Sequence, residues 1–145
     1  PYFTPSHGLR KAFSKAVKRK VKVILILPKI SDVKIMDIVR NRYLRELYKN
    51  GLHIYYYQPK ILHSKLLIID KKFFILGSSN LDYRSSLYQY EVNLLGKDKI
   101  IINSLRDYFN KTLSDCKPFD INEWKNRSSL RKLPELIFSL IEEYL

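Results

Sequence analysis

The sequence has a single cysteine and no long apolar run. Cys116 is the only cysteine among 145 residues, so no internal disulfide can form, and a reducing compartment is favoured. The longest apolar run, "VILILP" at Val23–Pro28, is far shorter than the roughly 20 residues of a membrane-spanning helix. We see no signal peptide. The chain begins with Pro1 and has Met36 as its only methionine, which indicates a fragment or a processed product.

What is present is typical of a globular domain with a basic character. Hydrophobic residues make up 46% and aromatic residues 13% of the sequence, and the length fits a single domain over 1–145. The net charge of +13 is uneven, because residues 1–60 hold 14 Lys and Arg against 3 Asp and Glu. A positive first section fits an anionic partner such as nucleic acid, anionic lipid or phosphate. The alternative is that most of these lysines are simply solvated.

Hydrophobic periodicity predicts alternating helices and strands. Ser6 is placed to cap a first helix. We expect helices over about 7–20, 33–50, 98–115, 120–127 and 130–145, and strands over 21–27, 52–59, 62–70, 72–80 and 88–96. The pattern predicts an α/β fold in which a mixed β-sheet is sandwiched between helices, with a helical tail over 120–145.

Polar side chains interrupt two of the expected strands. His63 and Lys65 are two residues apart and therefore share a strand face, and Ser78 and Asn80 repeat this spacing at the end of the next strand. If the two strand ends are neighbours, the Lys65 ammonium, the Ser78 hydroxyl and the Asn80 amide can surround one small anion. The His63 imidazole then lies beside that anion. Gly77 would let the backbone approach closely. Histidine is both a nucleophile and a near-neutral acid/base, so the group indicates phosphoryl transfer, with a satisfied core pair as the alternative.

No carboxylate cluster of the Mg²⁺-binding kind accompanies these residues in the sequence. We therefore expect chemistry without a metal and without a cofactor.

These residues reproduce a known signature. The spacing resembles that of the phospholipase D superfamily, whose His-x-Lys, Asp and Gly-Ser-x-Asn positions are matched here by His63, Lys65, Asp70, Gly77, Ser78 and Asn80. The flanking "YYYQPKILHSK", "NLDYRS" and "INEWKNRSSLRKL" resemble the C-terminal half of bacterial cardiolipin synthases. Ser79 and the run at 88–90 depart mildly from that branch.

The resemblance implies one half of a two-lobed enzyme at the bacterial cell membrane, held there peripherally or through a segment outside this chain. The implied reaction makes cardiolipin from two phosphatidylglycerol molecules, or acts on another anionic phospholipid, through a phosphohistidine. A second histidine would come from another phospholipase D-like half or from a homodimer mate. Because the chain matches the second half, the acid/base role is favoured for His63 over the role of nucleophile.

The same resemblance assigns roles to single residues. Lys65 is the counter-charge of the phosphate, and Ser78 and Asn80 donate hydrogen bonds to it. Asp70 belongs to the catalytic signature and is expected to anchor a turn or an ion pair. Glu91 is expected to place its carboxylate against the other ring nitrogen of His63, which would fix the tautomer.

Two other readings of the chain stay open. One is a phospholipase D-type phosphodiesterase or a homodimeric nuclease of the same superfamily, which the basic first section fits. The other is an inactive half-enzyme fragment. An apolar stripe over 133–144 predicts either a helix that packs on its own domain or an interfacial membrane helix.

Overall fold

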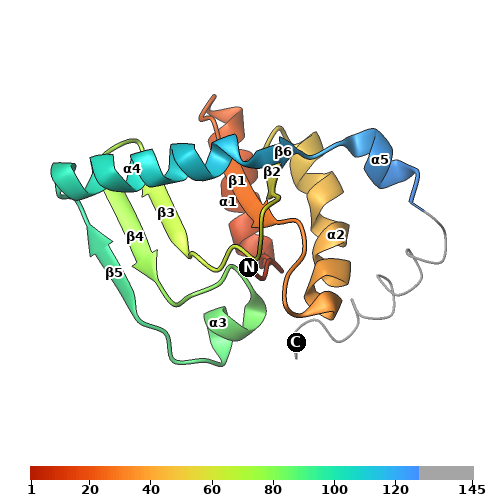
Figure 1. Ribbon diagram of the computed structural model, residues 1–145, viewed down its shortest axis with the longest axis horizontal. Helices are drawn as coiled ribbons and strands as arrows, with labels where there is room; N and C mark the ends of the chain where they lie inside the picture. Colours follow the sequence, from red (N-terminus) through yellow and green to blue (C-terminus); the bar gives the residue numbers. More distant parts are fainter. Residues whose placement is uncertain (128–145) are drawn as a thin grey trace.

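The computed structural model describes residues 1–127 of the chain (Figure 1). Its helices are α1 His7–Lys18, α2 Lys34–Lys49, α3 Tyr83–Leu87, α4 Lys99–Ser114 and α5 Ile121–Lys125. Its strands are β1 Ile24–Pro28, β2 His53–Tyr57, β3 Leu66–Ile69, β4 Phe73–Gly77, β5 Asn93–Gly96 and β6 Cys116–Pro118. The long helices match the expected segments to within a few residues, whereas α3 and β6 were not expected. The stripe over 133–144 lies outside the described residues.

One sheet has the order β1-β2-β6 and carries the main core. β1 and β2 are parallel, with Ile24 opposite His53, and β6 runs antiparallel to β2. α2 covers this sheet because its apolar residues recur every three to four positions. The fully buried cluster joins both elements to the first residues and to the segment after β6 (Phe3, Leu27, Val39, Tyr43, Leu44, Leu47, Leu52, Ile54, Phe119).

A second sheet has the order β3-β4-β5 and is antiparallel throughout. Phe74 at its centre is 2% exposed, but the edge strand β5 is largely open, with Leu94 60% and Leu95 65% exposed. The turn between β3 and β4 holds Asp70 and Lys71 at φ of 50° and 57°. Aspartate tolerates this left-handed backbone better than most residues, so the hairpin suits its sequence.

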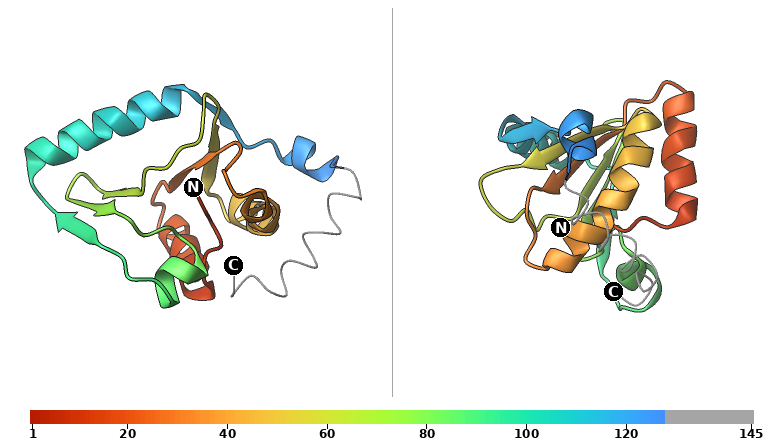
Figure 2. Two further views of the ribbon diagram at one scale, coloured as in Figure 1. Left: turned by 60° about the horizontal axis from the view of Figure 1, so that its bottom comes forward. Right: turned by 90° about the vertical axis from the view of Figure 1, so that its right-hand side faces the viewer.

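Helices lie on both sides of the β1-β2 region. Figure 2 (right) shows α1 and α2 on one side and α4 on the other. α4 contacts both β2 and β3, so it bridges the two sheets. The expected α/β architecture with strands between helices is confirmed, and the strands divide into two small sheets. The division falls at residues 58–65, which lie outside the named strands and link β2 to β3.

None of the helices within residues 1–127 combines the length and the apolar character needed to cross a lipid bilayer.

Candidate active site

His63 and Lys65 lie in the linking segment immediately before β3. The expected strand over 62–70 therefore begins only at Leu66, although the backbone stays close to β4, because the Gly77 amide donates to the Lys65 carbonyl at 3.3 Å. The ladder stops here because β4 ends at Gly77 and leaves no partner strand for the preceding residues. Both side chains are thus free of sheet packing, and His63 is exposed.

The Lys65 ammonium is directed at the imidazole of His63. Its Nζ lies 2.9 Å from Nδ1 and 3.2 Å from Nε2 of the ring, and it donates to the His63 carbonyl at 3.0 Å. Burial and then the charge of Lys65 lower the pKa of His63 below its ordinary value. An ammonium can donate only to a ring nitrogen that carries no proton, so this arrangement favours the neutral imidazole.

Ser78 and Asn80 follow the end of β4, beside the same segment. The Ser78 hydroxyl accepts a hydrogen bond from the Val92 backbone N–H at 2.9 Å, and the backbone N–H of Asn80 donates to the Ser85 hydroxyl at 3.1 Å. The side-chain oxygen of Asn80 is buried without a hydrogen-bond partner. A buried polar atom without a partner is uncommon in folded proteins, and a bound ligand or water molecule at this position would satisfy it.

Glu91 lies against Ser78 in this structure, and the expected pairing of its carboxylate with His63 stays a prediction. The Glu91 carboxylate accepts a short hydrogen bond from the Ser78 hydroxyl. The strand order gives the reason: β4 lies between β3 and β5, so the end of β4 separates the residues before β3 from those before β5. A strand was expected over 88–96, but β5 begins only at Asn93, so Glu91 lies before it.

The carboxylate of Glu91 nevertheless acts on the cationic centre of the site. Hydrogen bonds from Ser78 and Ser85, and then the charge of Lys65, lower the pKa of Glu91. Burial lowers the pKa of Lys65, while Glu91 and then Asp32 oppose this shift. Glu91 therefore helps to keep the Lys65 ammonium charged.

Asp70 lies apart from this cluster. It occupies the turn at the other end of β3, where its φ is 50°. Asp70 is five positions after Lys65, or roughly 16 Å along an extended chain. Asp70 is therefore a turn residue here, as the sequence suggested for its local role, and the structure does not bring it to His63.

Gly77 confirms the expected close approach of the backbone. A Cβ added there would lie 2.3 Å from both the Asn93 side-chain oxygen and the Val92 carbonyl. Only glycine fits where the end of β4 meets β5, and this contact sets the positions of Ser78 and Asn80.

Sequence reasoning missed two partners of the linking segment. Asp32, in the loop after β1, accepts a hydrogen bond from the Tyr2 hydroxyl at 2.9 Å, and its charge opposes the lowering of the His63 pKa. Tyr108 on α4 has its hydroxyl 2.6 Å from that of Ser64. Neither residue has a local sequence signal. The position of Asp32 after a strand end is the single clue.

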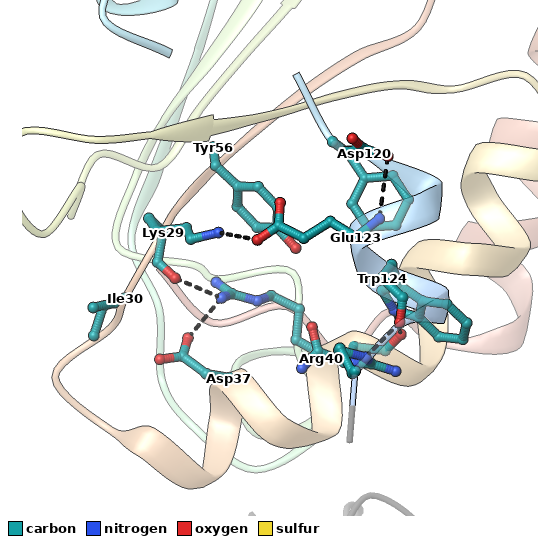
Figure 3. Close-up of a pocket in the computed structure, with 11 residues that line it drawn as sticks. Lys29, Ile30, Asp37, Arg40, Tyr56, Asp120, Glu123 and Trp124 are labelled. Carbon is teal, nitrogen blue, oxygen red and sulfur yellow. Dashed lines mark hydrogen bonds and ion pairs between the residues drawn. The ribbon is translucent and has the colours of Figure 1, made fainter. Parts of the chain in front are cut away.

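A separate polar cavity of about 280 Å³ lies between α2, β2 and α5 (Figure 3). Lys29 reaches Glu123 at 3.8 Å and lies 5.0 Å from the ring centre of Tyr56. Arg40 is 3% exposed, is 2.9 Å from Asp37 and donates to the Lys29 carbonyl at 3.2 Å. The opposite charges of this cavity pair with one another, and none of the candidate catalytic residues lines it. We regard it as a structural cluster that holds the loop after β1.

Within the described part of the chain, no group of three or more histidine, cysteine, aspartate and glutamate side chains could hold a metal ion.

Comparison with known proteins identifies the family. A family model described as "Cardiolipin synthase, PLD-like domain" matches residues 1–113. The chain belongs to this family of phospholipase D-like domains. The resemblance seen in the signature is thereby confirmed.

Curated relatives of this PLD-like domain are cardiolipin synthases. The chain is 34% identical over its whole length to cardiolipin synthase A from Buchnera aphidicola subsp. Baizongia pistaciae. It is 30% identical over 97% of its length to a cardiolipin synthase from Clostridium perfringens (strain SM101). In both cases it spans only 30% of the length of the relative.

Solved structures confirm the fold. Nuc from Salmonella typhimurium, a phospholipase D family member, superposes with a TM-score of 0.64 at 16% identity and covers 81% of this chain and 77% of that chain. NucT from Helicobacter pylori has a TM-score of 0.63 at 25% identity over 81% of this chain and 78% of that chain.

Proposed function

We propose that this PLD-like domain contributes one half of the active site of a phosphatidyltransferase that makes cardiolipin from two phosphatidylglycerol molecules. The observation that carries the proposal is the contact between the Lys65 ammonium and the neutral ring of His63, beside the hydroxyl of Ser78 and the amide of Asn80. A phosphodiester seated there meets a nucleophile or base and a set of fixed donors. Its phosphatidyl substrates place the protein at the bacterial cell membrane.

The reaction needs two histidines on opposite sides of one phosphorus. In the first step a ring nitrogen attacks the phosphorus, a phosphorus–nitrogen bond forms, and the bond to the glycerol oxygen breaks while the second histidine gives that oxygen a proton. In the second step the hydroxyl of another phosphatidylglycerol gives its proton to the second histidine and attacks the phosphorus, and the phosphorus–nitrogen bond breaks. Lys65 and Asn80 would stabilise the charge on the equatorial oxygens, and Ser78 would join them once its hydroxyl hydrogen turns from Glu91 to the substrate.

Two observations bear in opposite directions on the role of His63. The flanking motifs resemble the C-terminal half of cardiolipin synthases, which favours the acid/base role. The lowered pKa favours a neutral ring, which suits the nucleophile, because the acid of the first step must enter protonated. A denaturing quench at alkaline pH, with substrate labelled at phosphorus and the labelled peptide then mapped, separates the two roles. Only the nucleophile retains the label, and its phosphorus–nitrogen bond is stable in base but not in acid.

A chimaera tests the proposal. In it this chain replaces the aligned segment of the Clostridium perfringens cardiolipin synthase, which matches 97% of it. We expect phosphatidylglycerol vesicles to yield cardiolipin and glycerol, and the His63→Ala chimaera to lose this activity while keeping its circular dichroism spectrum. A folded chimaera without lipid turnover would contradict the proposal.

The basic first section favours a second candidate, a homodimeric nuclease or phosphodiesterase of the same superfamily. Efficient nicking of plasmid DNA by this chain, without lipid turnover in the chimaera, would support that candidate instead. Absence of both activities would support an inactive half-enzyme.

A further inference from the structure

A second cavity, of about 400 Å³, opens beside the His63 cluster and is predominantly apolar. It lies between the two sheets and extends to α1 and α4. Its walls include Phe13 of α1, Ile26 of β1, Leu66 of β3, Ile75 of β4 and Phe109 of α4. These side chains are only partly buried, although they belong to elements at the centre of the chain.

The strand β1 shows why the cavity is not filled by the main core. Val23, Leu25 and Leu27 pack with the buried cluster under α2. Because successive side chains of a strand point to opposite faces, Ile24 and Ile26 point away from that cluster, and both line the cavity. The cavity also reaches Val23, Leu25 and Leu27, so it lies against β1 and extends to the edge of the main core.

Polar groups of the phosphate-binding cluster form part of the same wall. Lys65 and Asn80 of the proposed phosphate site line the cavity together with the aliphatic residues, and the neighbouring Ser79 lines it as well. Asn80 is also the residue whose side-chain oxygen is buried without a partner. Sites for small molecules usually combine apolar walls with a few polar groups that fix the orientation, and their volumes start at about 300 Å³.

We propose that this cavity receives one acyl chain of the phospholipid whose phosphodiester is held by Lys65. The inference rests on the proposed function and adds the recognition of the hydrocarbon part of the substrate to it. A long apolar chain attached to an anionic phosphodiester matches both the apolar wall and the cationic edge. A compact polar alcohol or a nucleotide base would not fill the cavity with apolar groups that match its aliphatic wall.

The proposal predicts how the affinity for a lipid depends on the length of its acyl chains. Each methylene transferred from water to an apolar site strengthens binding by about fourfold. We expect affinity to rise in this way from dibutanoyl through dihexanoyl to dioctanoyl phosphatidylglycerol, measured calorimetrically with chain 1–145 and with each lipid below its micelle concentration. Glycerophosphoglycerol, which has the same headgroup and no acyl chains, should bind far more weakly.

Isoleucine methyl NMR locates the bound chain without any mutation. The δ1 methyl groups of Ile24, Ile26 and Ile75 should shift with the lipids and stay unchanged with glycerophosphoglycerol. Ile100, which is 78% exposed on α4, serves as the control for nonspecific contact. Shifts at Ile100 equal to those of the cavity methyls, or none at the cavity methyls, would overturn the proposal.

A cavity-filling variant gives a second, matched measurement. Ile26→Phe should abolish the dependence on chain length and leave the weak affinity for glycerophosphoglycerol unchanged, whereas Ile100→Phe should alter neither. Chain-length dependence that survives in a folded Ile26→Phe variant would overturn the proposal.

The two proposals fail in different ways. Loss of headgroup affinity in Lys65→Ala, without any dependence on chain length in the unmodified chain, would refute the acyl site and support the phosphate site. If Lys65→Ala has no effect while the cavity methyls still respond to chain length, the acyl site stands and the assigned phosphate site does not.

Discussion

Ser78 donates its hydroxyl hydrogen to the carboxylate of Glu91, and this pair joins the end of β4 to the residues before β5. The same hydroxyl accepts from the Val92 amide at 2.9 Å, so both of its hydrogen-bonding functions are occupied. Burial lowers the pKa of Lys65, and the charge of Glu91 opposes that shift. The carboxylate therefore acts on the site in two ways, by positioning Ser78 and by supporting the charge of Lys65.

Glu91→Gln separates these two actions, because the amide oxygen can still accept from Ser78 while the charge is gone. We expect the turnover of the chimaera to fall by on the order of 10²-fold. The alkaline limb of its pH profile should move to lower pH, since Lys65 loses the charge that raises its pKa. A lower rate with an unchanged pH profile would show that Glu91 has only a structural role. Glu123→Gln, in the separate polar cavity, is the matched control and should alter neither quantity.

The case of Glu91 shows where sequence reasoning ended. The spacing of His63, Lys65, Ser78 and Asn80 is a local property, and it correctly indicated that two strand ends meet. The partner of Glu91 depends on the order β3-β4-β5, which is set by pairing between distant segments. A pattern along the chain does not contain that order, so the contact of Glu91 with Ser78 could not be predicted from the sequence.

The fold shows the same difference between local signals and pairing of distant segments. Helical periodicity located α1, α2 and α4 because one amphipathic helix defines its own buried face. The short helix α3 follows from a local cap, in which Asp82 accepts from the Ser85 amide at 2.7 Å, but five residues are too few for a periodic signal. The division into two sheets was not predictable, because it depends on where the segment over 58–65 fails to find a partner.

The titration of His63 should report the neighbouring ammonium. Burial and Lys65 place its pKa below the ordinary value of 6.5, so the folded chain binds this proton less tightly than the unfolded chain. A step that needs neutral His63 should be fully active at pH 7 and decline as the pH falls through the lowered pKa. Lys65→Ala should raise that pKa, because one cause of the shift is removed.

NMR titration of the His63 ring in both variants measures this effect directly. Lys65→Arg is the matched variant that keeps the charge, and it should keep the pKa lowered. A pKa that is the same in Lys65→Ala and in the unmodified chain would contradict the contact between the two side chains.

Gly77 should tolerate no side chain. The Cβ of Gly77→Ala would meet backbone and side-chain oxygens 2.3 Å away on the neighbouring strand, and these atoms belong to the segment that also contacts Ser78. We expect a loss of at least about 2 kcal/mol in the free energy of unfolding, measured by urea denaturation, together with weaker phosphate binding. Gly8→Ala is the control, because its nearest neighbour would be the Ser6 hydroxyl at 3.9 Å and its position in α1 favours alanine. Equal stability of the two variants would contradict the close approach.

This chain alone, as a monomer, should be inactive. The proposed reaction needs two histidines, and the chain has one signature histidine, since the residues two positions after His7 and His53 are Leu9 and Tyr55.

The segment that follows Ser78 and Asn80 also presents large apolar side chains to solvent (Leu87 66%, Tyr88 63%, Tyr90 108%, Val92 82% exposed). Exposed apolar surface beside an incomplete site is typical of a lost or exchangeable interface. Sedimentation equilibrium combined with activity assays over a range of concentrations checks the prediction. Activity in the monomer peak would refute the need for a second motif, and activity that follows dimer formation would show that two copies complete the site.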